Sequence, residues 1–125
     1  MRLLLDTHVF LWAVSDDKRL SGEARKRILD ADEVFVSSAS IWEASIKAGL
    51  GKLDVDVNLL IGEITKSGFS ELPVRALHAV RLRDLPHIHR DPFDRLLIAQ
   101  AMTEPLALVT HDPILAGYTD LVIVV

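Results

Sequence analysis

Four acidic residues of this 125-residue chain share one context, the junction between an apolar run and a helix-like segment. They are Asp6, Glu43, Asp94 and Asp112. Oxygen ligands such as carboxylates are those that Mg²⁺ and Mn²⁺ prefer. Two such ions about 3.5–4 Å apart activate a water and stabilise the leaving oxygen in phosphodiester cleavage. The four positions therefore indicate a divalent-metal site with hydrolytic chemistry.

Each of these acids also has a structural interpretation. Asp6 and Asp112 stand where helix caps stand, and Pro113 follows as proline does at a first helical position. Ser40 and Glu43 fit the S-x-x-E capping box. Asp94 lies three residues after Asp91, where an acid favours the helix dipole. The residues alone leave both interpretations open, one shared site or four separate caps.

The acids must be positioned by a regular alternation of strands and helices. Strands are predicted at 3–5, 33–37, 69–74, 106–110 and 121–125, and helices at 8–14, from 21, at 38–50, 57–66, 75–84, 92–104 and 113–116. Continuous apolar strands separated by helices predict a mainly parallel sheet covered on both faces, a three-layer α/β/α sandwich. The chain, residues 1–125, is expected to form a single domain.

Because the carboxyl ends of parallel strands meet at one edge, the junction acids are expected to converge there. Asp94 is the exception in detail, since the segment before it, 86–90, reads as a loop. The strand at 69–74 contains Pro73 and is predicted at a sheet edge. Trp12 and Trp42 lie among apolar residues at helical spacing and are predicted in the core.

Polar neighbours of the acids are candidates for substrate binding. Thr7 and Thr110 could hydrogen-bond a ligand carboxylate or a bound water. Lys47, Lys52, Arg90 and Arg95 could neutralise the phosphates of a substrate, and Arg95 is the strongest candidate because it adjoins Asp94. The loop histidines His87, His89 and His111 receive no role, since a metal site needs no histidine base.

Composition restricts the remaining classes. The net charge is −4, with 14 basic and 18 acidic residues, so no large basic nucleic-acid face is indicated. Any nucleic acid would be held by local basic residues or through metal ions. There is no cysteine, which excludes thiolate sites, and no apolar run approaches the roughly 18 residues of a membrane span. We expect a cytoplasmic protein without a membrane partner.

At this point the motifs resemble the PIN domain, and more narrowly the VapC-type toxins of bacterial toxin–antitoxin pairs. The segments that carry the resemblance are Leu3–His8, Ser40–Glu43, Ile46–Leu53, Asp91–Ala101 and Val109–Asp112. It implies a Mg²⁺- or Mn²⁺-dependent ribonuclease with an RNA substrate, a cognate antitoxin and a homodimeric state. The implied metal ligands are Asp6, Glu43, Asp94 and Asp112, of which the last is the least constant in the family. His8 departs from the asparagine that many members carry, and the roles of His8 and Asp91 stay open, with Asp91 preferred as a cap.

Two other functions were weighed against a nuclease. An aspartate-nucleophile phosphatase would need a second acid two residues after Asp6, where His8 stands. A non-catalytic binding module, receiver-like or PIN-like, would in the receiver case need paired acids after the first strand and a lysine after the last.

Overall fold

The fold of residues 1–125, described by a computed structural model, is organised around its first strand. The five strands are β1 (Arg2–Leu5), β2 (Glu33–Ser37), β3 (Ser70–Leu72), β4 (Ala107–Thr110) and β5 (Val122–Val124). Their order in the sheet is β3-β2-β1-β4-β5, so β1 is central. All four pairings are parallel. The predicted parallel α/β architecture is confirmed.

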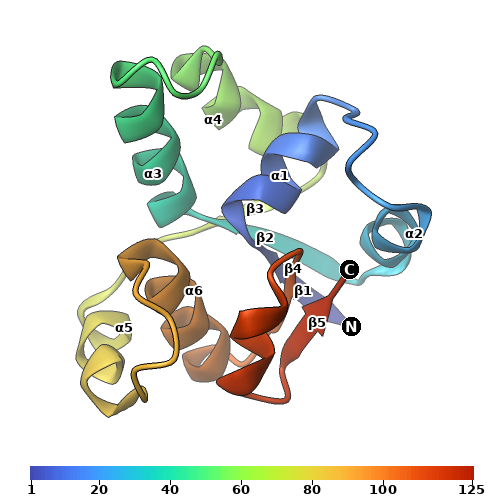
Figure 1. The fold of residues 1–125 in the computed structure, drawn as a ribbon. Coiled ribbons are helices and arrows are strands. Elements are labelled where there is room, and N and C mark those ends of the chain that lie inside the picture. Colours follow the sequence, from blue (N-terminus) through green and yellow to red (C-terminus); the bar gives the residue numbers. More distant parts are fainter.

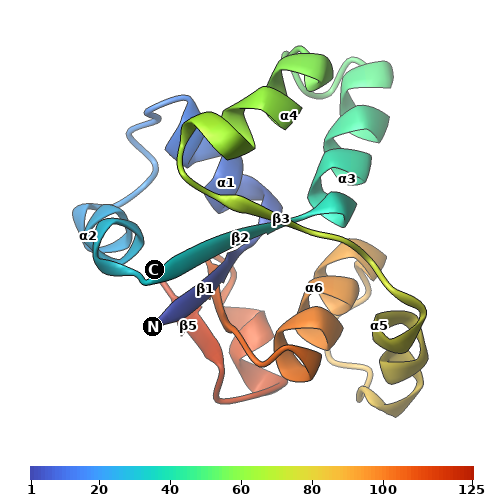
Figure 2. The same ribbon diagram turned by 180° about the vertical axis from the view of Figure 1, so that it is seen from behind.

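Helices cover both faces of this sheet. They are α1 (Thr7–Val14), α2 (Gly22–Asp30), α3 (Ser38–Gly49), α4 (Val57–Lys66), α5 (Ala76–Arg81) and α6 (Pro92–Thr103), with 3₁₀ turns at Leu82–Asp84 and Pro113–Gly117. Figure 1 shows α1, α3 and α4 above the strands and α5 and α6 below them. Figure 2 shows the same layers from behind, with β3 at the near edge. None of the helices reaches the length and apolarity that a membrane span requires.

Successive side chains of β1 point to opposite faces of the sheet and belong to two separate cores. Leu3 and Leu5 join the core under α1 to α4, which also contains Phe10. Leu4 points to the other face and joins the core under α6, together with Leu97. Because all three leucines are fully buried, β1 is held from both faces, as a rigid support for the residue that follows it.

Two of the predicted elements differ from those observed. The strand predicted at 69–74 is limited to Ser70–Leu72, because Pro73 has no N–H to continue the ladder; its position at the sheet edge is confirmed. The helix predicted at 75–84 is divided into α5 and a 3₁₀ turn at Leu82–Asp84.

The prediction that Trp42 lies in the core is wrong, whereas Trp12 is buried as predicted. Trp42 is 59% exposed, and its one ring contact is with Phe93 at the start of α6, edge-on at 5.0 Å between centroids. The buried face of α3 consists instead of Ala39, Ser40, Glu43 and Ala44. Glu43 is thus buried on α3, where the helical period predicted that Trp42 would be buried.

Candidate metal centre

Asp6 caps helix α1 and also lies among the clustered acids. It follows β1 at the carboxyl edge of the sheet and is only 5% exposed. Its Oδ1 accepts the N–H of Val9 at 2.8 Å, which caps α1, and its Oδ2 accepts the Thr110 hydroxyl at 2.5 Å. Burial raises the pKa of Asp6 although both hydrogen bonds lower it. The Asp6 side chain can therefore both cap α1 and contribute to a site shared with the other acids.

Asp94 shows that the acids converge. It lies in the first turn of α6, which Asp91 caps by accepting the N–H groups of Phe93 and Asp94 at 2.8 and 3.1 Å. Burial, followed by the negative charges of Asp91, Asp6 and Glu43, raises the pKa of Asp94 to about 7. These three acids therefore lie close enough to Asp94 for their charges to act on its carboxyl group.

Glu43 lies in the second turn of α3, not in the first turn as predicted, and the capping box is absent because Ser37 caps the helix. Its side chain is 5% exposed. One oxygen, Oε2, pairs with Lys47 Nζ at 2.7 Å, whereas Oε1 is buried without a hydrogen-bond partner. A buried carboxylate oxygen without a partner is costly, and a cation would satisfy it.

Asp112 is held by His89, a residue for which the sequence predicted no role. Its Oδ1 accepts the N–H of Ile114 at 3.0 Å, confirming it as a cap, and its Oδ2 lies 3.0 Å from His89 Nε2. His89 Nε2 also lies 3.7 Å from Asp94 Oδ2. Ligand atoms of His89, Asp94 and Asp112 all fall within 4.8 Å of one another. The only sequence signal for His89 is its place just before the D-P-F-D segment.

The hydrogen bonds of His89 assign its tautomer. Its Nδ1 accepts the N–H of Asp91 at 3.0 Å, so the ring proton is on Nε2, which donates to Asp112. In this arrangement His89 orients a carboxylate rather than offering a lone pair to a cation. Its loop is fixed in turn by Tyr118, whose hydroxyl accepts the His89 backbone N–H at 2.7 Å.

This geometry predicts a specific effect of His89 on cation binding. His89→Ala is expected to weaken Mn²⁺ binding by about 10–100-fold, since it removes the donor that orients Asp112. His89→Gln, whose amide can donate to the same oxygen, is expected to recover part of the loss. Isothermal titration calorimetry with MnCl₂ measures both, and equal affinities for wild type and His89→Ala would contradict the orienting role.

Three of the acids open onto solvent together. Asp6, Asp94 and Asp112 line a cleft of about 500 Å³, together with His8, Trp12, Arg19, His111 and Pro113. Glu43 reaches the same acids from α3. Trp42 precedes Glu43 and Phe93 precedes Asp94, and the contact between these two rings holds α3 against the start of α6. The structure thus brings all four predicted ligands to one edge of the sheet, with Asp91 beside them.

The predicted substrate-binding residues occupy different places. Thr110 donates to the carboxylate of Asp6 and Lys47 to that of Glu43, whereas Thr7 is buried and donates to Ser40 Oγ at 2.9 Å. Arg95 donates to the Leu82 and Pro86 carbonyls and to Tyr118, so its guanidinium is used by the loop before α6. Nothing in these contacts supports Arg95 as an RNA ligand.

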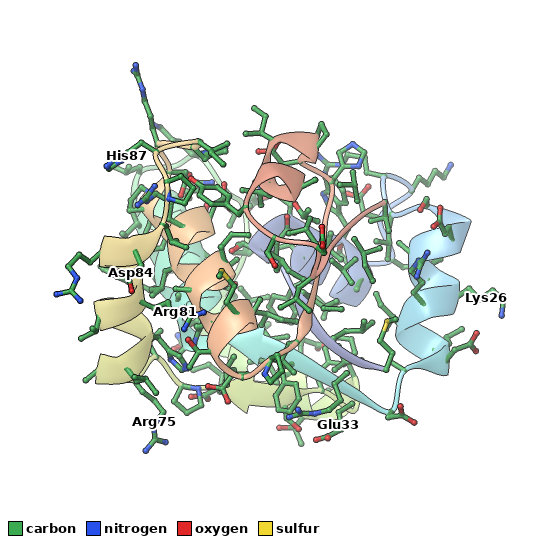
Figure 3. The ribbon with its side chains drawn as sticks, turned by 90° about the horizontal axis from the view of Figure 1, so that it is seen from below. Lys26, Glu33, Arg75, Arg81, Asp84 and His87 are labelled. Carbon is green, nitrogen blue, oxygen red and sulfur yellow. The ribbon has the colours of Figure 1, made fainter.

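The remaining basic candidates lie outside the carboxylate cleft. Lys52 lines a neighbouring hollow, and Arg90 is exposed on the loop before α6. His87 is also exposed, and Figure 3 shows it on the loop side of α5, at the outer edge of the molecule.

Comparison with known proteins agrees with this fold. The PIN domain family model matches residues 3–120. Over 115 residues the chain is 31% identical to Ribonuclease VapC22 of Mycobacterium tuberculosis, covering 88% of this chain and 86% of that protein.

Solved structures share the fold at low identity. VapBC2 from Rickettsia felis, bound to a DNA fragment from its promoter, gives a TM-score of 0.69 at 16% identity, covering 98% of this chain and 96% of that chain. FitAcB from Neisseria gonorrhoeae gives 0.67 at 16% identity, with 98% and 96% covered. DNA-bound VapBC from Salmonella typhimurium gives 0.69 at 16% identity, with 100% and 97% covered. By sequence match and architecture, the chain belongs to the PIN domain family, among proteins of the VapC type.

Proposed function

We propose that the protein is a divalent-metal-dependent endoribonuclease acting as the toxin of a toxin–antitoxin pair. The observation that carries the proposal is the gathering of Asp6, Glu43, Asp94 and Asp112, with Glu43 Oε1 buried and unsatisfied. This donor set consists of oxygens alone, which suits Mg²⁺ or Mn²⁺. The residues therefore fit the cation that the family implies.

The electrostatics of the site explain why it would need a cation. Asp94 has its pKa raised to about 7 by burial and by the acids around it. A phosphodiester would add further negative charge to the same cleft. Lys47, paired with Glu43, supplies only part of the compensation. Mg²⁺ or Mn²⁺ held by these acids would supply the rest and would activate the attacking water.

The protein's own contribution is positioning. Thr110 fixes one oxygen of Asp6 and the N–H of Val9 fixes the other, so this carboxylate has a single orientation. Asp112 is fixed in the same way by His89 and Ile114. A phosphatase mechanism with Asp6 as nucleophile lacks its second acid, because His8 stands two residues after Asp6.

The substrate and partner come from the relatives. VapC22 is named a ribonuclease, and two of the similar structures are VapBC assemblies bound to DNA. By analogy we propose RNA as substrate, an antitoxin protein as partner and a homodimer as the working state.

The test is metal-dependent cleavage. Purified protein is expected to cut RNA with MgCl₂ or MnCl₂ present, to stop with EDTA, and to recover when Mn²⁺ is restored. Mapping of 5′ ends in RNA from cells that express wild type or Asp6→Asn protein locates the cleavage sites, since asparagine keeps the cap and removes the charge. Identical cleavage by Asp6→Asn, or a failure of calorimetry to detect Mg²⁺ or Mn²⁺ binding, would contradict the proposal and favour a binding-only module.

A further inference from the structure

Lys47 is the only lysine or arginine whose charged group lies within salt-bridge distance of one of the four clustered acids. Its Nζ donates to Glu43 Oε2 at 2.7 Å. This hydrogen bond raises the pKa of Lys47, and the negative charges of Asp91 and Asp94 act on the ammonium in the same direction. A single ammonium thus faces several carboxylates of the site.

The pair of Lys47 and Glu43 differs from a similar pair elsewhere in the chain. The Glu43 side chain is 5% exposed and that of Lys47 is 36% exposed. Lys26 and Asp30 on α2 have the same spacing and the same distance of 2.7 Å, but their side chains are 77% and 63% exposed. Exposed pairs contribute little to stability, whereas loss of the partner of a buried carboxylate leaves an uncompensated charge. Lys47 therefore stabilises the fold in a way that Lys26 does not.

A divalent cation would compete with Lys47 for the same carboxylate. Lys47 holds Oε2 of Glu43, while Oε1 is buried without a hydrogen-bond partner. A cation bound to this carboxylate would lie beside the ammonium, and like charges repel strongly where little water screens them. The metal-free arrangement of Glu43 and Lys47 is therefore unfavourable once a cation is present.

The Lys47 side chain is able to leave the site without any movement of its helix. Lys47 lies in the last turn of α3, which ends at Gly49. Its ammonium is carried by a flexible four-carbon stem, and the side chain already reaches solvent. The negative end of the helix dipole favours a positive charge at this end of α3. Solvent and the helix terminus thus offer the ammonium another position.

We propose that Lys47 is the internal counterion of the metal-free site, and that binding of a divalent cation displaces its ammonium from Glu43. The proposal rests on the proposed metal-dependent function, of which it describes the regulation. As counterion, Lys47 allows the chain to fold with its acids together before a cation arrives. As competitor, it lowers the affinity for the cation and helps the site to release it.

Displacement is measured in the wild-type protein by limited acetylation with acetic anhydride, followed by mass spectrometry of chymotryptic peptides. Lys47 is expected to react about tenfold faster in saturating MnCl₂ than in EDTA, because its amine is no longer held by Glu43. Lys26 is the internal reference, since its pair lies on α2, which Figures 1 and 2 show on the opposite side of the molecule from α3. Unchanged or slower acetylation of Lys47 in MnCl₂ would overturn the displacement.

Lys47→Met tests the competition, because it keeps an apolar stem and removes the charge. In EDTA its midpoint of thermal unfolding is expected to be about 4 °C or more below that of wild type. Its dissociation constant for Mn²⁺, from calorimetry, is expected to be about tenfold lower, since no ammonium has to be displaced. Lys47→Arg, which keeps a cation, is expected to recover most of both changes. Lys26→Met is the matched control and is expected to behave as wild type in both measurements.

The results separate this inference from the proposed function. Unchanged or weaker Mn²⁺ binding in Lys47→Met, with cleavage of RNA by wild type, would overturn the counterion and leave the ribonuclease standing. Release of Lys47 by Mn²⁺ and tighter binding in Lys47→Met, without any cleavage of RNA by wild type, would support the counterion and overturn the ribonuclease. The acetylation result does not depend on whether Lys47→Met folds, because it is obtained with wild type.

Discussion

Asp94→Asn is expected to lower the rate of RNA cleavage by about a thousandfold or more, a loss of about 4 kcal/mol in transition-state stabilisation. The substitution keeps the side-chain volume but removes a charge from the centre of the acids. A weaker cation site would leave the attacking water and the leaving oxygen without most of their stabilisation. Single-turnover cleavage of a labelled RNA with saturating Mn²⁺ measures the rate.

The control for this substitution is Asp84→Asn. Asp84 ends the 3₁₀ turn after α5, its side chain is 65% exposed, and Figure 3 shows it at the outer edge of the molecule. The same change of charge there is expected to leave the rate within about twofold of wild type. A rate for Asp94→Asn within tenfold of wild type would show that Asp94 does not hold the catalytic cation.

The same substitution is expected to stabilise the metal-free protein. Asp94 has a pKa of about 7 in the folded chain against an ordinary value of 3.8, so the folded state binds more protons than the unfolded state between these values. Stability contributed by this group is therefore lost as the pH rises through that window. Since each pKa unit corresponds to about 1.4 kcal/mol and the side chain is partly solvated, we expect a loss of roughly 2–4 kcal/mol.

Urea unfolding in EDTA, from about pH 5 to about pH 8, tests this linkage. Wild type is expected to lose stability over the range, whereas Asp94→Asn loses less and is the more stable protein at the alkaline end. Burial also raises the pKa of Asp6, so a smaller slope of the same sign remains in the variant. If the difference between wild type and Asp94→Asn did not change with pH, the raised pKa of Asp94 would be disproved.

The sequence was sufficient to predict the parallel sheet and the edge of the sheet at which the acids meet. A run of three apolar residues ending in Asp6 determines a doubly covered strand, and parallel strands place their following residues together. The bounds of α6 were equally well marked, because Asp91 caps it and Pro92 opens it. Convergence at this edge followed from topology alone, without knowledge of any side-chain contact.

The features that the sequence did not predict depend on which surfaces pack together in the folded chain. The period of α3 has apolar residues on more than one side, and only the positions of α1, α4 and α6 decide that Glu43 is covered and Trp42 is not. The contacts of His89 and Arg95 could not be predicted for a related reason. Both residues contact Tyr118, which lies 29 and 23 positions further along the chain.

The hydrogen bond from Thr110 to Asp6 joins residues 104 positions apart, and it has a consequence for how the protein is made. The central strand β1 leaves the ribosome about a hundred residues before β4, which pairs with it and brings Thr110 and Asp112 to the edge. A nascent chain that has produced Asp6, Glu43 and Asp94 still lacks one side of the cleft. Translation itself thus delays assembly of the carboxylate cleft until β4 has been released to pair with β1.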